Sequence, residues 1–388
     1  MLSALIVIIF STLGTAWFLN AKAKELRHPK SVLWGAYAFH YLLFAVYYIN
    51  SLYNNSDSRR YYRDSFSGSY IGDSWEDFYG IGSVFIKFMA FPFVNGLGFS
   101  YEAMMLLFSF FGFLGILYFY LFMVDKTTFR HRFLGVDFVV LLLFLPNMHF
   151  WTVSLGKGGV ILMGLGMVFY GLSDIGRRLI TTAIGGLLIF HVRPHILLVV
   201  LLGAVVASLT SSKGIKTWQK TLIVLVAIAA LVPVAGTFLD LAEIDDASAD
   251  GFTDFSDTRG QSLTKADSGV DIANYNQFMK LFTFWFRPLF VDSPNAMGLL
   301  VSVENVFYLI LFWKCLSMSF VRFVLQSSWA VKISLVTFFG ISFALAQISG
   351  NMGIAIRQKS QVMYLFLFIV LAYADYAYRT RGKVIIGE

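Results

Sequence analysis

Charged residues and cysteine are scarce in this chain of 388 residues. Asp, Glu, Lys and Arg together make up 14% of the sequence, whereas 57% of the residues are apolar and 18% are aromatic. A soluble domain cannot bury that much apolar surface, so the composition predicts a protein whose solvent is mostly lipid. The single cysteine, Cys315, excludes an intrachain disulfide framework and a cysteine-based metal site.

Several catalytic motifs are also missing from the sequence. The segment 156–159, Gly-Lys-Gly-Gly, lacks the upstream glycine of a nucleotide-phosphate loop, and there is no metalloprotease helix motif or serine nucleophile elbow. The acids clustered over residues 240–257 do not fit the spacing of a calcium loop. We therefore predict no cofactor and no metal ligands, with a divalent ion as the open alternative. The net charge of +7 does not indicate nucleic acid, because most cations lie in short connections between apolar runs.

Long apolar runs, in contrast, are abundant. A helix that crosses a membrane needs roughly 17–25 mostly apolar residues, and eleven runs are candidates, several of them short. The predicted fold is all-α: a polytopic membrane protein with one membrane domain over residues 1–388. The runs that flank Pro146 and Pro194 indicate tight hairpins. The candidate spans are residues 2–19, 31–52, 101–123, 136–150, 160–172, 179–190, 196–209, 221–238, 296–313, 333–348 and 362–378.

The positions of lysine and arginine predict the orientation of these spans. Eighteen of the 30 Lys and Arg lie in alternate connections, which the positive-inside rule assigns to the cytosol. The N-terminus is then outside and the C-terminus is cytoplasmic. Two long loops, about residues 53–100 and 240–295, face outward. Within them, residues 85–94 and 278–290 are apolar or aromatic enough to lie along the membrane.

The other twelve Lys and Arg lie on the predicted outer side. Some of them adjoin apolar runs, where an unpaired charge costs several kcal/mol. One guanidinium group can bind two phosphate oxygens, and lysine adds a point charge. A cluster of such cations is therefore typical of a phosphate-binding pocket. The alternative is that they anchor the chain at lipid headgroups. The candidate phosphate-binding residues are Lys157, Arg193 and Arg357, the nearby His149, His191 and His195, and Arg60 in the first outer loop.

The first outer loop also supplies an acid. Asp57 follows the end of a predicted span by about five residues, so its carboxylate stays near the membrane surface. A carboxylate fixed there is suited to accept a proton from a sugar hydroxyl. The alternative is a solvated acid that pairs with Arg60 or Arg63. A solvated role is favoured for the other acids of the loop, which are Asp64, Asp73, Glu76 and Asp77.

Aromatic residues accompany these groups. Their rings are suited to stack on sugar faces, and anchoring at the membrane interface explains them equally well. The candidates are Tyr61, Tyr62, Trp75 and Trp151.

Short patterns at these positions resemble those of GT-C type membrane glycosyltransferases. An acid followed by Tyr-Tyr, over 57–62, resembles their first outer loop, and residues 145–157 resemble their Pro–Phe-Trp–Lys hairpin. Residues 192–195, Val-Arg-Pro-His, resemble an Arg-Pro motif of bacterial members and of O-antigen-type polysaccharide polymerases. Arg357 resembles another cationic position of the group.

This resemblance implies roles for individual residues. Asp57 takes the role of catalytic base, and Lys157, Arg193 and Arg357 take the role of holding the lipid-linked (pyro)phosphate. One departure is that members often carry an acid after the hairpin lysine, where this chain has Gly158. As a second departure, we expect no large soluble C-terminal domain.

The sequence thus leads to the hypothesis of an inverting glycosyltransferase or polysaccharide polymerase at the outer face of a bacterial inner membrane. It would pass a sugar or oligosaccharide from a polyprenyl-(pyro)phosphate donor to a hydroxyl of a second lipid-linked glycan. The expected partners are these substrates, membrane lipid and polysaccharide-assembly proteins, and no nucleic acid. A flippase or transporter of a lipid-linked glycan is the main alternative, and a scaffold protein is a third.

Overall fold

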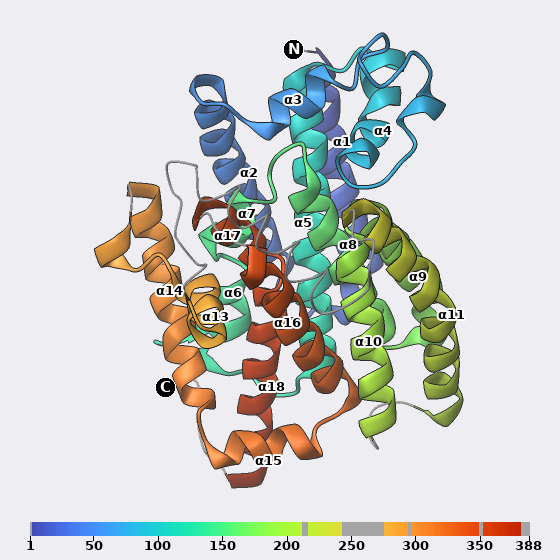
Figure 1. Cartoon of the computed structure of the whole chain (residues 1–388). Coiled ribbons are helices and arrows are strands. Elements are labelled where there is room, and N and C mark those ends of the chain that lie inside the picture. Colours follow the sequence, from blue (N-terminus) through green and yellow to red (C-terminus); the bar gives the residue numbers. More distant parts are fainter. Residues whose placement is uncertain (1, 212–215, 243–274, 294–295, 349–351, 382–388) are drawn as a thin grey trace. The chain divides into compact units, whose positions relative to one another are not determined.

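A computed structural model of the chain is almost entirely helical (Figure 1). It describes residues 2–211, 216–242, 275–293, 296–348 and 352–381. Most of the second predicted outer loop, including its acidic segment over 243–257, lies outside the described residues. The all-α prediction is therefore confirmed for the described part of the chain.

The chain forms two compact units. Unit 1 comprises residues 1–128 and 139–193, and unit 2 comprises residues 129–138 and 194–388. Each unit has its own buried core. The single membrane domain expected from the sequence stays a prediction.

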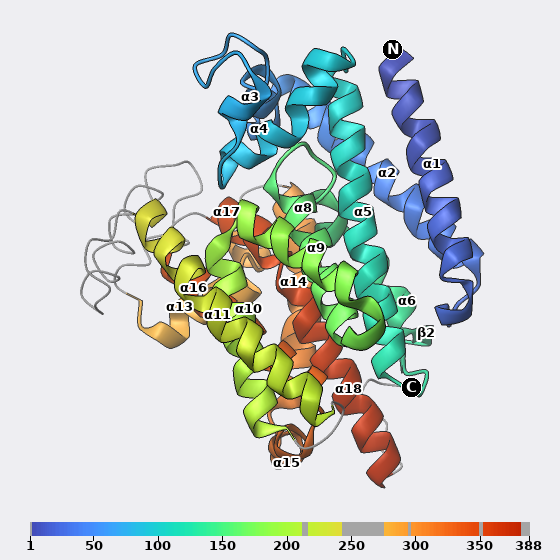
Figure 2. The same ribbon diagram turned by 90° about the vertical axis from the view of Figure 1, so that its right-hand side faces the viewer.

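Unit 1 is built around α5, whose side chains are almost all buried from Ala103 to Val124. α8 packs along α5, and α9 lies beside α8, as Figure 2 also shows. α1 and α2 pack on α5 as well. The long helices of unit 1 are α1 (Leu2–Ala21), α2 (Lys30–Tyr53), α5 (Tyr101–Lys126), α8 (Lys157–Leu172) and α9 (Ile175–Val192).

Glycines allow these helices to approach closely. A Cβ added at Gly115 of α5 would lie 2.6 Å from the backbone nitrogen of Met163 on α8. On the other side of α8, a Cβ added at Gly185 of α9 would lie 2.7 Å from the carbonyl oxygen of Gly164. Small residues at such contacts are the usual means of packing helices in lipid, where no hydrophobic force drives helices together.

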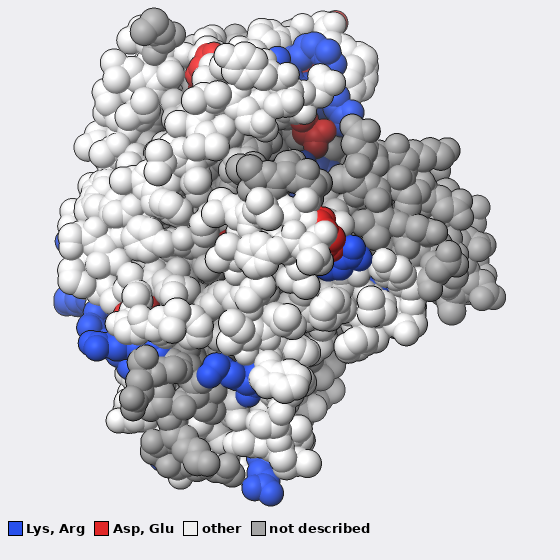
Figure 3. All heavy atoms as spheres, turned by 90° about the vertical axis from the view of Figure 1, so that its left-hand side faces the viewer, with Lys and Arg blue, Asp and Glu red and all other residues white. Residues whose placement is uncertain are grey.

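The surface of unit 1 is suited to lipid. Large apolar side chains are exposed on α1 and α9, for example Leu13, Trp17 and Ile180. Most of the described surface in Figure 3 carries no charge. Apolar exposure of this extent is unfavourable in water and is expected where lipid covers the helices.

One connection that the sequence assigns to the cytosol folds through ion pairs. Arg178 contacts the carboxylate of Glu25 at 3.1 Å and lies 3.9 Å from the ring of Tyr170. Lys22 donates to Glu25 at 3.0 Å. Burial alone would raise the pKa of Glu25, but the hydrogen bonds from Tyr170 and Lys22 lower it below its usual value. These cations therefore tie the short helix η1 (Ala23–Glu25) to α8 and α9.

The first predicted outer loop is folded. Its apolar segment forms α4, and α4 docks on the end of α9, because Gly82 donates its backbone N–H to the carbonyl of His191 at 2.7 Å. The elements of this loop are α3 (Asp57–Arg63), η2 (Trp75–Phe78), α4 (Ser83–Phe91) and the π-helical turn η3 (Pro92–Gly96).

Residues 136–150 do not form the one span that the sequence predicts. They divide into the end of a β-hairpin and two five-residue helices, α6 and α7. The turn over Leu134 and Gly135 has φ angles of 50° and 79°, which starts the hairpin, and Pro146 begins α7 because it has no N–H to continue a helix. The elements are β1 (Arg132–Phe133), β2 (Val136–Asp137), α6 (Phe138–Leu142) and α7 (Pro146–Phe150).

Unit 2 is built around α16 and α18. α16 packs on α10, on α13 and on α18, and nearly every side chain of α18 up to Ala377 is buried. The elements of unit 2 that follow the hairpin are α10 (Pro194–Thr210), α11 (Thr217–Ala242), α13 (Gln277–Phe286), η4 (Phe290–Asp292), α14 (Ala296–Cys315), α15 (Met318–Gln326), α16 (Trp329–Ile348), α17 (Met352–Lys359) and α18 (Met363–Arg381).

Six of the described helices are long and apolar enough to cross a membrane, or seven if α17 and α18, which are bent by 50°, form one broken span. Shorter apolar helices lie over the other predicted spans, including α8, α10 and the first part of α11. A multi-pass membrane protein fits these helices. The number of eleven spans and their orientation stay predictions.

Candidate functional site

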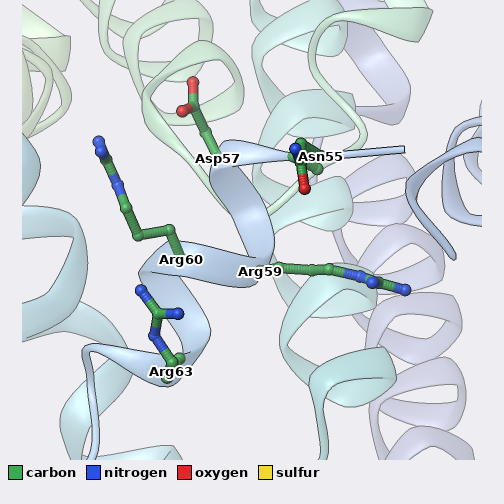
Figure 4. A pocket seen from close by; sticks show the side chains of 6 residues that line it. Asn55, Asp57, Arg59, Arg60 and Arg63 are labelled. Atoms are coloured by element: carbon green, nitrogen blue, oxygen red, sulfur yellow. The ribbon is translucent and has the colours of Figure 1, made fainter. Parts of the chain in front are cut away.

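The short helix α3 carries a pocket of about 560 Å³ in unit 1 (Figure 4). Ser56 is the N-cap of α3, and its side chain accepts a hydrogen bond from the N–H of Ser58. Asp57, the first residue of the helix, is exposed, and its negative charge is favourable at this position. The pocket is lined by Asn55, Ser56, Asp57, Arg59, Arg60 and Arg63.

The arginines of α3 point in different directions. Arg60 extends toward the side of the helix on which Asp57 lies, whereas Arg59 points away (Figure 4) and donates to the carbonyl of Leu52 at 3.0 Å. Arg63 contacts Asp64 at 3.3 Å with a largely exposed side chain. Asp57 and Arg60 are thus the carboxylate and guanidinium that α3 offers together.

Aromatic residues hold α3 in place. Tyr61 is only 4% exposed, and its hydroxyl lies 3.4 Å from that of Ser83. Tyr62 donates to the carbonyl of Phe99 at 3.0 Å. Ser58 lies 2.7 Å from the hydroxyl of Tyr101 on α5. Tyr61, which the sequence offers as a sugar-stacking residue, is therefore enclosed in the loop and positions α3 in this conformation.

A buried ion pair fixes α3 to α4. Lys87 and Asp64 lie 3.2 Å apart, with side chains that are 4% and 7% exposed. The Lys87 ammonium also lies 4.7 Å from the ring centre of Tyr70. The sequence favours a solvated role for Asp64, and the structure corrects this, because α4 folds back over the loop and brings Lys87 to it.

Lys157 lies close to the same loop. It is the first residue of α8, and a Cβ added at Gly82 would lie 3.5 Å from its Nζ. Gly82 also binds the carbonyl of His191, two residues before Arg193, the C-cap of α9. Since Ser83 touches Tyr61, the segment 82–83 joins α3, the start of α8 and the end of α9. The structure thus brings the α3 pocket, Lys157 and the α9 terminus to one end of unit 1.

His191 has both ring nitrogens engaged. Its Nδ1–H donates to the carbonyl of Leu187 at 2.9 Å, and Nε2 accepts from the hydroxyl of Tyr79 at 3.0 Å. The ring stacks on Phe85 at 4.6 Å between centroids. His191 therefore holds α4 on α9, and through its carbonyl it positions Gly82.

An aromatic column continues from His191. Phe85 stacks on Phe88, and Phe88 stacks on Trp75 at 4.9 Å. The indole N–H of Trp75 donates to the carbonyl of Phe88 at 2.9 Å, yet the side chain is 47% exposed. Trp75 is thus an aromatic ring fixed in position and open to solvent. The other candidate tryptophan, Trp151, is half-buried and donates to Asn147 at 3.0 Å.

Two predicted ligands belong to unit 2, and a third is enclosed within unit 1. His195 is the second residue of α10 and Arg357 lies on α17, and both are half-buried residues of unit 2. His149 is in unit 1 but is 0% exposed, and its ring contacts that of His40. A side chain so enclosed has no route to a substrate in this conformation.

Sequence reasoning misses the buried Lys359 of unit 2. Its ammonium is 0% exposed and donates to the Oδ1 of Asn305 at 2.6 Å and to the carbonyls of Arg287 and Trp285 at 3.1 and 3.2 Å. The signal was Glu304 and Asn305 within an apolar span, since polar groups at such positions usually have partners. Among the described residues, no group of three His, Cys, Asp or Glu is placed to hold a metal.

Gly158 has a structural reason to be glycine. A Cβ at this position would lie 2.4 Å from the carbonyl oxygen of Trp151. We expect Gly158→Ala to lower the free energy of unfolding by about 1–3 kcal/mol, because a tightly packed site must shift. Thermal unfolding of the purified protein in detergent measures this, with Gly186→Ala as control, since nothing lies within 4 Å of a Cβ there. Equal melting temperatures for wild type and Gly158→Ala would refute the steric account.

Comparison of the chain with protein-family models, curated proteins and solved structures gave no match. A functional interpretation therefore rests on the chemistry of the residues that the structure brings together.

Proposed function

We propose that the chain is a membrane glycosyltransferase or polysaccharide polymerase that uses a polyprenyl-(pyro)phosphate-linked sugar donor. The observation that carries this proposal is the α3 pocket, in which the exposed carboxylate of Asp57 and the guanidinium of Arg60 share one helix. Lys157, the first residue of α8, lies close to Gly82 of the same loop. A carboxylate next to anion-binding groups suits a reaction that takes up a proton and releases a phosphate.

The proposed step is a direct displacement. The hydroxyl oxygen of the acceptor sugar bonds to the anomeric carbon of the donor, and its proton moves to the carboxylate of Asp57. The bond from the anomeric carbon to the (pyro)phosphate oxygen breaks, and the carrier phosphate leaves with the electron pair. Attack opposite the leaving group inverts the anomeric configuration.

Cations of unit 1 stabilise the leaving phosphate in this mechanism. Arg60 supplies a guanidinium that can bind two phosphate oxygens, and Lys157 supplies a point charge. Lys157 stands at the first turn of α8, where the positive end of the helix dipole adds to its charge. Arg193 at the end of α9 is the third member, and Trp75 and Trp151 are the rings proposed to stack on the sugar. Arg357 and His195 stay proposed ligands from unit 2.

The proposed location is the outer face of a bacterial inner membrane, because the positive-inside rule assigns the loop with α3 to that side. There a lipid-linked donor and acceptor meet within the plane of the membrane. Polysaccharide-assembly proteins are the proposed protein partners.

One observation favours the alternative of a flippase for a lipid-linked glycan. Lys359 and Glu304 are buried charged residues in apolar helices of unit 2, and buried charge in a membrane often marks a transport path. However, the ammonium of Lys359 already has three acceptors, whereas the pocket with Asp57 is open. The open site favours the transferase.

The role of Arg60 is tested with full-length protein in liposomes that contain a polyprenyl-pyrophosphate-linked oligosaccharide. We expect Arg60→Gln to raise the KM for this donor by about 10- to 100-fold, because the variant loses one charge-assisted hydrogen bond to phosphate. Arg177→Gln is the matched control, because the Arg177 side chain is 88% exposed and pairs with Asp174 at the other end of α9. Wild-type KM in the Arg60 variant would remove Arg60 from the mechanism.

A further inference from the structure

Two histidines form a buried pair in unit 1. His40 of α2 and His149 of α7 are both 0% exposed, and their Nδ1 atoms lie 2.9 Å apart. The Nε2 of His40 lies 2.9 Å from the carbonyl oxygen of Ser109, and the Nε2 of His149 lies 2.9 Å from that of Leu143. The two rings thus make three short polar contacts in a row.

These contacts need more protons than a neutral pair holds. A carbonyl oxygen only accepts, so both Nε2 atoms must carry a hydrogen. A third hydrogen must then lie between the Nδ1 atoms, because two bare lone pairs 2.9 Å apart repel each other. Two neutral imidazoles carry two ring protons, and three contacts require three. The arrangement is therefore complete only when the pair holds one extra proton.

We propose that His40 and His149 form a binding site for a single proton, shared between their two Nδ1 atoms. The distance identifies the occupant. An N–H···N hydrogen bond fits 2.9 Å, whereas a tetrahedral metal ion about 2.0 Å from each of two imidazole nitrogens needs them roughly 3.3 Å apart. Both imidazoles keep their Nε2–H on a carbonyl, which fixes the Nδ1 atoms toward each other.

The surroundings of the pair decide the balance between its charged and its neutral form. No carboxylate, ammonium or guanidinium contacts either ring in the described structure, so burial opposes the positive charge. The charged form is favoured by its three hydrogen bonds. It is also favoured by the rings of Phe39, Tyr41 and Phe113, which lie against the imidazoles and attract a positive charge. The neutral form loses one of the three hydrogen bonds, so pH selects between the forms.

Most titratable groups on the packed elements are tyrosines. On α2 they are Tyr37, Tyr41, Tyr47, Tyr48 and Tyr53, with Lys30 at the N-terminal end. On α5 the charged residues are in the end turns, at Glu102, Asp125 and Lys126, and the tyrosines are Tyr101, Tyr118 and Tyr120. α7 and the connection that precedes it carry none besides His149.

His149 of the pair is hydrogen-bonded to the turn that precedes Lys157. The carbonyl of His149 accepts hydrogen bonds from the N–H and the hydroxyl of Thr152, at 2.9 and 3.0 Å. The carbonyl of Thr152 in turn packs against Gly112 and Gly159, where no Cβ fits. A proton that locks His149 onto α2 therefore locks the turn from which α8 begins. Only this link to turnover rests on the proposed function.

The proton site is tested by thermal unfolding of the full-length protein in detergent between about pH 5 and 9, a range that brackets histidine titration. The unfolded chain carries two free imidazoles that each bind a proton at pH 5, whereas the folded pair binds at most one, so stability is lost as pH falls through the histidine range. We expect the Tm of the wild type to fall by several degrees between about pH 7 and 5. His149→Gln should keep the same slope, because a lone buried His40 stays neutral and unfolding again takes up one proton. A slope that is lower by one proton in this variant would show that the folded wild-type pair stays neutral and would overturn the proposal. His28→Gln, which replaces a buried histidine outside the pair, reports the contribution of one other histidine to the slope.

Nuclear magnetic resonance of ¹⁵N-histidine-labelled wild type gives a second test if the His149 variant does not fold. Coupling between the two Nδ1 nuclei across a shared proton, lost as pH rises, is the expected result. Two Nδ1 resonances that stay unprotonated at every pH would overturn the proposal. If the pair titrates while Asp57→Asn leaves turnover unchanged, the proton site stands and the proposed reaction fails.

Discussion

Asp57→Asn is expected to lower kcat for sugar transfer by about 10²- to 10⁴-fold, the usual contribution of a positioned general base. The amide keeps the size of the side chain and its place at the start of α3, but it cannot accept the proton of the acceptor hydroxyl. Because the change leaves the arginines of the pocket in place, the KM for the lipid-linked donor should change little. Initial rates of product formation in liposomes measure both parameters.

The control for this variant is Asp73→Asn. Asp73 is an exposed acid of the same loop, outside the α3 pocket. It should keep the wild-type rate within a factor of about two. A similar loss in both variants would indicate a general effect of loop charge, and full activity of Asp57→Asn would exclude Asp57 as the base.

Lys87→Met is expected to destabilise the fold of the first loop by up to about 3–5 kcal/mol, the cost of removing one partner of a buried ion pair. Asp64 would stay buried with its charge and keep only the largely exposed Arg63 as a partner, and α3 would lose its attachment to α4. Faster protease cleavage within residues 64–100 of the purified protein reports the effect. The double variant Lys87→Met/Asp64→Leu should recover part of the protection, because it removes both charges.

Lys24→Met serves as the matched control, because Lys24 is an exposed lysine of a different connection. It should leave the cleavage pattern unchanged. If Lys87→Met resists protease as well as wild type, the buried pair does not hold the loop, and the position of α3 needs another explanation.

Protease cleavage of the loop distinguishes a residue that acts on substrate from a residue that positions α3. Lys87→Met would also reduce turnover, because α3 carries Asp57, but it would do so together with new protease sites. Asp57→Asn should reduce turnover with an unchanged cleavage pattern. A residue that acts on substrate is thereby distinguished from one that positions the helix.

Apolar runs predict the long helices well, because a backbone in lipid must satisfy its own hydrogen bonds. The predicted spans 2–19, 31–52 and 101–123 fall within α1, α2 and α5. The span 136–150 fails, since hydropathy does not register the turn at Leu134-Gly135 or the helix start at Pro146. Local backbone chemistry overrides composition there.

The candidate site was predictable only in part. Asp57 and Arg60 are three residues apart, so their shared helix face follows once a helix is recognised. The approach of Lys157 to Gly82 joins segments that are 75 residues apart, and no local pattern predicts it. The same holds for Asp64, which the sequence presents as one more loop acid.

The histidines show the same limit. His149 was predictable as a polar residue of a tight hairpin, but its partner His40 lies in the middle of an apolar span where packing normally decides the residue. Their pairing depends on how α7 turns back against α2, which is a tertiary contact. A sequence reader therefore places His149 at the surface with the other cations.

The central claim is that the chain forms glycosidic bonds, and it is tested most directly by product analysis of the reconstituted reaction. The full-length protein in liposomes receives one polyprenyl-pyrophosphate-linked oligosaccharide, and mass spectrometry follows the glycan and the carrier. The account predicts a longer lipid-linked glycan together with one released carrier pyrophosphate for each bond formed. An unchanged lipid-linked glycan that has moved to the other leaflet would contradict the transferase and establish the flippase.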